Sequence, residues 1–111
     1  AVLRVAALGA PGGVLRDETA PLRAGELMLA VGRSHSGGAT AALGIVSAAG
    51  GPWRTWRGGH LEQLVKLDLA LYPGASGGAL VDVEGRIAGL ASSALSRVSP
   101  VAVPAQTIRR V

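Results

Sequence analysis

Residues 72–81 of the chain read YPGASGGALV. Its glycine-rich bend, which follows Pro73 and leads into an apolar run, holds one hydroxyl, that of Ser76. Glycine adopts conformations that tighten such a bend, so that neighbouring backbone N–H groups can converge. Converging N–H groups are the donors that acyl transfer needs for the oxyanion of its tetrahedral intermediate. The stretch therefore indicates Ser76 as a nucleophile, provided that a base takes its proton.

The apolar segments around the bend have the length of β-strands. The 111 residues include 17 glycines and 6 prolines, which leave runs of roughly 4 to 8 residues between turns, as in an all-β barrel or sandwich. The chain also opens in strand-like sequence over residues 1–5. We expect one domain over residues 1–111, with strands near 27–31, 41–49, 61–68, 79–83, 86–91 and 101–103 and a short helix from residue 105 to residue 110.

Composition excludes several classes of protein. Apolar residues make up 49% of the chain and charged residues 16%, which argues for a folded domain. Without cysteine there is no disulfide and no thiolate metal site. No run approaches the ~20 apolar residues of a membrane helix. The net charge of +4 comes from arginines spread along the chain, which indicates solvated surface rather than a nucleic-acid-binding face.

The sequence contains two histidines, and one aspartate lies shortly before Ser76. His35 and His60 lie in glycine-rich stretches, and we interpret both as solvated loop residues rather than catalytic or metal-binding ones. Asp68, eight residues before Ser76, reads as a carboxylate at a strand end. Residues 53–57, WRTWR, interleave aromatics with arginine, a pattern that can stack on bases but that we interpret as an exposed hairpin tip.

Two serine-hydrolase architectures could use Ser76. The G-x-S-x-G elbow of α/β-hydrolases requires a helix after the serine and a histidine later in the chain. Here a strand–turn–strand pattern follows Ser76, and both histidines precede it. The sequence therefore favours an architecture whose base and acid come before the serine.

Residues 67–81, LDLALYPGASGGALV, resemble the nucleophile region of trypsin-like serine proteases, particularly the HtrA (DegP-like) branch, which has proline just before the Gly-x-Ser-Gly-Gly turn. Further similar segments are 22–26, 29–32, 43–48, 85–90 and 101–104, so the resemblance covers nearly the whole chain. It implies a single six-stranded antiparallel Greek-key β-barrel with a short C-terminal helix, the second barrel of the chymotrypsin-like fold.

The resemblance also implies what the chain lacks. In this family an Ala-Val-Leu-x-Val strand follows the catalytic aspartate almost at once, and the chain begins with AVLRV. We therefore expect the base histidine and the orienting aspartate to belong to an absent N-terminal barrel. The fragment alone should then be inactive, within a parent that is a serine endopeptidase, bacterial and extracytoplasmic, either periplasmic or membrane-anchored.

Site residues follow from the same resemblance. Ser76 would be the nucleophile, and the backbone N–H groups of Gly74 and Ser76 would form the oxyanion hole. Ala75 departs from the usual aspartate or asparagine. The substrate pocket would be lined by six residues, namely Ala70, Leu71, Ser92, Ser93, Ala94 and Val101. Since none carries a charge, a small or medium aliphatic residue should precede the cleaved bond.

Three functions stay open at this stage. The first is the nucleophile-bearing half of a peptidase, with a polypeptide substrate, the N-terminal barrel as partner, and no cofactor, metal, nucleic acid or membrane contact. The second is a catalytically inactive protease-like scaffold or peptide-binding domain, which Ala75 favours. The third is a β-barrel binding module for a nucleic acid or protein. We also expect self-association through the exposed inter-barrel face.

Overall fold

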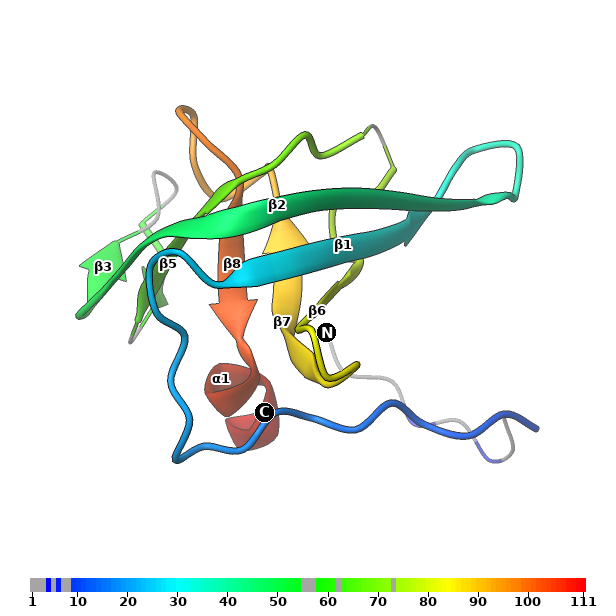
Figure 1. The fold of residues 1–111 in the computed structure, drawn as a ribbon, viewed down its shortest axis with the longest axis horizontal. Helices are drawn as coiled ribbons and strands as arrows, with labels where there is room; N and C mark the ends of the chain where they lie inside the picture. Colours follow the sequence, from blue (N-terminus) through cyan, green and yellow to red (C-terminus); the bar gives the residue numbers. More distant parts are fainter. Residues whose placement is uncertain (1–3, 5, 7–8, 55–57, 62, 73) are drawn as a thin grey trace.

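Six strands form a closed antiparallel barrel in the computed structural model, which describes residues 4, 6, 9–54, 58–61, 63–72 and 74–111 (Figure 1). The strands are β1 (Leu27–Arg33), β2 (Ala39–Gly50), β5 (Leu64–Asp68), β6 (Ala79–Val81), β7 (Ile87–Ser92) and β8 (Val101–Pro104), followed by helix α1 (Ala105–Arg110). Around the barrel they are ordered β1-β2-β5-β8-β7-β6. The predicted all-β barrel with a short C-terminal helix is confirmed.

The order of the strands sets the position of the stretch that contains Ser76. β5 pairs with β2 and β8, whereas β6 pairs with β1 and β7. The connection from β5 to β6, residues 69–78, therefore joins strands that are not neighbours. It contains Ser76.

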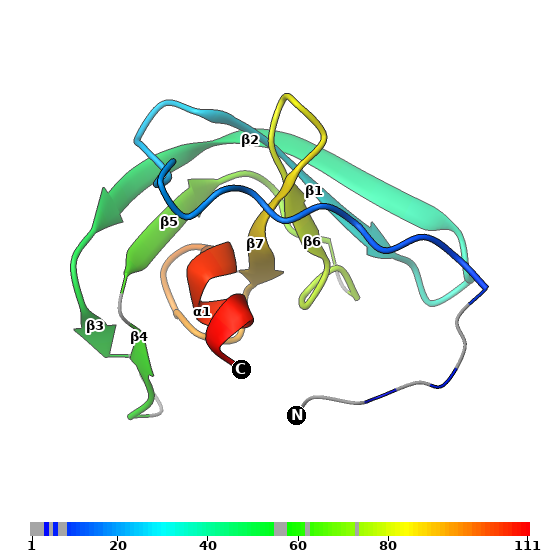
Figure 2. The ribbon, with the colours of Figure 1, turned by 90° about the horizontal axis from the view of Figure 1, so that it is seen from below.

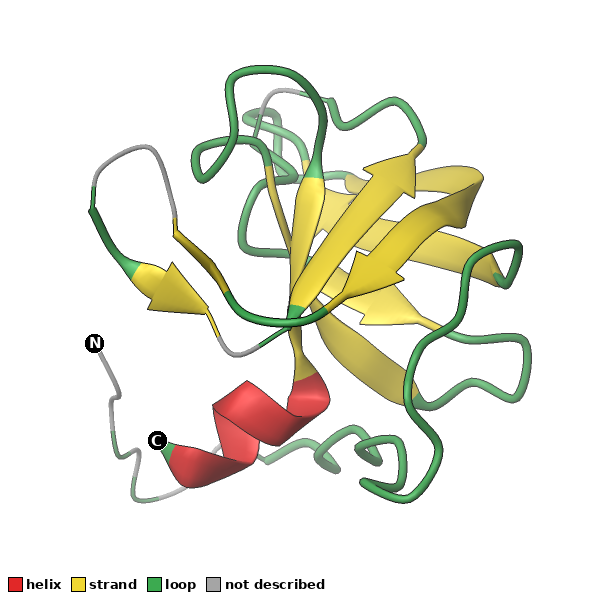
Figure 3. Cartoon of the chain, turned by 90° about the vertical axis from the view of Figure 1, so that its left-hand side faces the viewer, coloured by secondary structure: helices red, strands yellow, loops and turns green. Residues whose placement is uncertain are grey.

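A second, two-stranded sheet stands beside the barrel. β3 (Trp53–Arg54) pairs with β4 (His60–Leu61), and Figure 3 shows the pair projecting from the barrel's side. The predicted strand over 61–68 is thus divided, with barrel pairing from Leu64 onward. Trp56 and Arg57, and most of the strand expected over residues 1–5, lie outside the described residues.

The barrel interior is filled by alternate residues of its strands. Met28 and Ala30 of β1, Val65 and Leu67 of β5 and Leu80 of β6 are all buried. The period of two is that of strands with one face turned inward. Small residues on the other side, Ala88, Ala91 and Ala102, complete the core.

The outward side of the same strands is also apolar. We define the outer apolar face as Leu27, Leu29, Val31, Leu43, Ile45, Val81 and Leu90, which neighbour one another across β2, β1, β6 and β7. Leu43 is 71% exposed and Leu27 52%. A solvated sheet side is normally polar, so an exposed apolar face of this kind is unusual.

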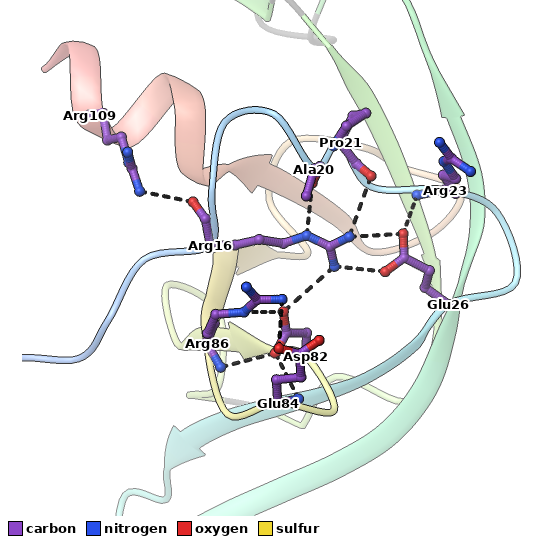
Figure 4. Close-up of polar contacts among 9 residues, drawn as sticks. All are labelled: Arg16, Ala20, Pro21, Arg23, Glu26, Asp82, Glu84, Arg86 and Arg109. Carbon is purple, nitrogen blue, oxygen red and sulfur yellow. Dashed lines mark hydrogen bonds and ion pairs between the residues drawn. The ribbon is translucent and has the colours of Figure 1, made fainter.

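Before β1, the chain is fastened to the barrel by a charged cluster (Figure 4). Arg16 donates from Nη1 to Glu26 Oε2 at 2.7 Å and from Nε to the carbonyl of Ala20 at 2.8 Å. It also lies 3.7 Å from Asp82 Oδ2. Figure 2 shows this segment passing β7, where Leu15 pairs with Ile87.

Asp82 anchors the turn between β6 and β7. Its Oδ1 accepts the backbone N–H groups of Glu84 at 2.9 Å and Arg86 at 3.0 Å. Burial raises the pKa of Asp82, but these two N–H donors and the guanidinium groups of Arg86 and Arg16 outweigh it, so the pKa is lowered overall. The ionised carboxylate therefore stabilises the fold above its unfolded pKa, and this contribution is lost as pH falls through the folded value.

Asp82→Ala should lower the free energy of unfolding by about 1–3 kcal/mol, because two N–H groups lose their acceptor. Asp82→Asn is the matched variant, since it keeps an acceptor oxygen and removes the charge. We expect its difference from wild type to shrink from about pH 7 toward about pH 3, as the wild-type carboxylate protonates. Urea unfolding across that range measures both, and a difference that grows on acidification would contradict the assignment.

Candidate active site

Ser76 lies in a tight double turn between two glycines with left-handed backbone. Gly74 has a φ of 84° and Gly77 a φ of 87°, values that favour glycine. The N–H of Ala75 donates to the carbonyl of Tyr72, and the N–H of Gly78 donates to the carbonyl of Ala75, each at 2.9 Å. The side chain of Ser76 is exposed on the outside of this bend.

The turn packs directly against the end of β1. A Cβ on Gly32 would lie 2.8 Å from Ala75 Cα, and a Cβ on Gly78 would collide with the carbonyl oxygen of Val31. Ala75 Cα and the Val31 carbonyl oxygen both belong to the backbone, so neither can rotate out of the way as a side chain could. These glycines let the turn press against β1, and Ala75 is correspondingly buried.

Two backbone N–H groups of the turn have no acceptor among the described residues, those of Gly74 and Ser76. The N–H groups of Ala75, Gly77 and Gly78 are all bonded within the fold. Unpaired amides in such a turn can hold an anionic oxygen.

The hydroxyl of Ser76 meets the end of β7. Its Oγ accepts the N–H of Ser93 at 3.2 Å. Two backbone bonds support this contact, from the N–H of Gly77 to the carbonyl of Ala91 at 2.7 Å and from the N–H of Ala91 to the carbonyl of Gly78 at 2.9 Å. The structure thus brings the segment from Ser92 to Ala94 beside Ser76.

The other predicted pocket residues lie in different surroundings. Ala70 is exposed, while Leu71 is half-buried against the core. Val101 is fully buried and lies opposite Ser92 in the β7–β8 pair. Ser92 itself is half-buried, and Ser93 and Ala94 are exposed.

The two histidines lie apart. His60 is in β4, opposite Arg54. His35 follows β1, and its Nε2 is 3.8 Å from where a Cβ on Gly74 would be. Neither is hydrogen-bonded to Ser76 in the described part of the chain. Asp68 is exposed at the end of β5, as expected for a strand-end carboxylate.

Sequence reasoning missed two neighbours of the turn. It treated His35 as an ordinary loop residue, although the pairing of β1 with β6 brings it beside Gly74. It also did not anticipate the bond from the N–H of Ser93 to Ser76. The resemblance to a known family had named Ser93 only as a pocket residue.

No group of three or more histidine, aspartate or glutamate side chains able to hold a metal ion occurs in the part of the chain that the structure describes. No helix there is long and apolar enough to cross a membrane.

Comparison with known proteins gives a consistent set of similarities. The family described as trypsin-like peptidase domain matches residues 1–90. The periplasmic pH-dependent serine endoprotease DegQ of Escherichia coli strain K12 is 37% identical over 75 residues, which cover 68% of this chain and 16% of that protein. A probable periplasmic serine endoprotease, DegP-like, of Buchnera aphidicola subsp. Schizaphis graminum is 35% identical over 79 residues, 68% of this chain and 15% of that protein.

Solved structures agree in fold. The HtrA-type protease AlgW with a tripeptide superposes with a TM-score of 0.69 at 33% identity, over 91% of this chain and 34% of that one. Deg5 gives a TM-score of 0.70 at 26% identity, over 88% of this chain and 45% of that one. The chain thus spans less than half of these structures and about a sixth of the curated relatives.

Proposed function

This chain belongs to the trypsin-like peptidase family, and we propose that it carries the nucleophile of an HtrA-like serine endopeptidase. The observation that carries the proposal is the exposed Ser76 hydroxyl, in a glycine-flanked turn with two amides that have no acceptor among the described residues. Similarity to AlgW, an HtrA-type protease solved with a tripeptide, supports a polypeptide substrate.

In the proposed reaction, Ser76 Oγ attacks the carbonyl carbon of the substrate peptide. The carbonyl oxygen becomes an oxyanion, which the N–H groups of Gly74 and Ser76 hold. The serine proton passes to a histidine base and then to the leaving amine, leaving an acyl-enzyme that water hydrolyses. An aspartate orients that histidine.

We assign the histidine and aspartate to another part of the parent protein, an N-terminal barrel. Three observations support this division of roles. No described histidine bonds to Ser76. The chain spans 34% of the AlgW structure and 45% of Deg5. The outer apolar face, which is exposed, runs along β6 directly from the nucleophile turn.

A second candidate is a catalytically inactive, peptide-binding member of the family. Ala75 favours it, because the residue is buried beside Gly32 and offers no polar group that could fix the oxyanion turn. The two candidates differ in one chemical property, the reactivity of Ser76 in the complete protein.

A fluorophosphonate should label Ser76 in the full-length parent, because the base activates the hydroxyl and the two amides hold the phosphonyl oxygen. Peptide mapping by mass spectrometry locates the adduct, and Ser76→Ala should abolish it. The isolated chain should label far more slowly, since it lacks the base. A folded parent that stays unlabelled would support the inactive, peptide-binding alternative.

The full-length parent should cleave after valine or alanine in preference to arginine. The side chains proposed to line the pocket carry no charge, so a buried guanidinium would lack a partner, at a cost of several kcal/mol. Peptides that differ only at this residue should show kcat/KM at least about 10-fold higher for valine than for arginine. A preference for arginine would refute the pocket assignment.

The isolated chain should self-associate through the outer apolar face, because burial of exposed leucines is favourable. Leu43→Glu, at a position that is 71% exposed within the face, should shift the protein toward monomer. Val98→Glu is the control, since Val98 is 92% exposed but lies in the β7–β8 loop, outside the face. Sedimentation velocity distinguishes them, and equal effects of both variants would contradict the role of the face.

A further inference from the structure

We propose that the turn Ser92–Ala94 holds the Ser76 hydroxyl in one orientation, and that Ser92 is a positioning residue for the nucleophile. This role rests on the function proposed above, and it differs from that of a pocket wall. Ser92 would act on Ser76 through the backbone of Ser93.

The nucleophile turn is hydrogen-bonded to the end of β7. Residues 76–78 and 91–93 are joined by three hydrogen bonds, of which two are backbone pairs of Ala91 with Gly77 and Gly78, at 2.7 and 2.9 Å. The third runs from the N–H of Ser93 to Ser76 Oγ at 3.2 Å. The two backbone bonds fix the separation of the segments, so the Ser93 N–H is held at the distance that the hydroxyl needs.

The side chain of Ser92 restrains the peptide that carries the Ser93 N–H. Ser92 Oγ accepts the N–H of Ala94 at 3.2 Å, a bond across two residues that fixes a turn of this kind. The backbone of Ser92 is itself held, because it pairs with Val101 of β8. Without the Ser92 hydroxyl, the Ser93 N–H would lose the local bond that directs it at Ser76.

The bond from the Ser93 N–H leaves the Ser76 hydroxyl able to react. A serine hydroxyl has one proton to donate and two lone pairs. When one lone pair accepts the Ser93 N–H, the proton stays free for the base and the other lone pair stays free for attack. The bond also selects one of the three staggered side-chain rotamers, which alone is a factor of about 3 in the reactive population.

The experiment uses the full-length parent and a small fluorophosphonate, whose rate of reaction with Ser76 depends on the hydroxyl more than on the substrate pocket. For Ser92→Ala we expect a labelling rate about 3- to 10-fold lower, with kcat for a peptide reduced and KM unchanged. Ser92→Thr keeps the hydroxyl and should restore the rate.

A matched control lies four residues further along the chain, in the β7–β8 loop. Ser96 Oγ accepts the N–H of Val98 at 3.3 Å, the same bond across two residues as that of Ser92 but without contact to Ser76. Ser96→Ala should therefore leave the labelling rate unchanged. An equal decrease for Ser96→Ala and Ser92→Ala would indicate general loosening of the loop and would overturn the positioning role.

A second pair of variants removes the donor itself. Ser93→Pro lacks the N–H, whereas Ser93→Ala keeps it, and the extended conformation of Ser92 in β7 is the one that proline favours for its predecessor. We expect Ser93→Pro to label at least about 3-fold more slowly than Ser93→Ala.

The outcomes separate this role from the proposed function. A labelled wild-type parent whose Ser92→Ala variant reacts at the same rate would overturn the positioning role alone. A rise in KM with an unchanged labelling rate would do the same, and would leave Ser92 as a pocket wall. An unlabelled wild-type parent would overturn the proposed function, and the positioning role with it.

Discussion

The close approach of the turn that contains Ser76 to the end of β1 is the constraint on which the rest of the candidate site depends. A Cβ on Gly32 would collide with Ala75 Cα, and a Cβ on Gly78 would collide with the Val31 carbonyl oxygen. Both are backbone atoms that cannot move aside. Because the turn is pressed into this position, Ala75 is buried, Ser76 faces outward, and the amides of Gly74 and Ser76 are left without acceptors among the described residues. The chemistry of the turn thus follows from packing of main chain against main chain.

Local patterns in the sequence were sufficient to predict the strands and the location of the turn, whereas the choice of a barrel over a sandwich came from the resemblance to trypsin-like proteases. Short apolar runs between glycines gave the strands, and the Gly-x-Ser-Gly-Gly stretch gave Ser76, because both signals are local. Contacts across the barrel were not predictable in the same way. A period of two tells which side of a strand a residue occupies but not what it meets, so the bond from Ser93 to Ser76 and the position of His35 beside Gly74 became visible only with the strand order.

The outer apolar face explains a second difference between sequence and structure. The run over 27–31 contains no polar residue, and from the sequence we interpret it as a buried strand. In the structure Met28 and Ala30 are buried, while Leu27 and Leu29 remain exposed. The apolar composition of β1 on both faces agrees with the proposal that another part of the parent protein covers the outer apolar face.

Helix α1 is hydrogen-bonded to the segment that holds Arg16, the residue at the centre of the charged cluster before β1 (Figure 4). Arg109 reaches the carbonyl of Arg16 at 2.9 Å, and Gln106 reaches that of Glu18 at 3.0 Å. Each contact closes a loop of most of the polypeptide and so carries a large entropy of closure, and we expect it to form after the local hairpins. Interactions absent from the transition state govern the rate of unfolding rather than that of folding. We therefore expect these two contacts to slow unfolding more than they speed folding.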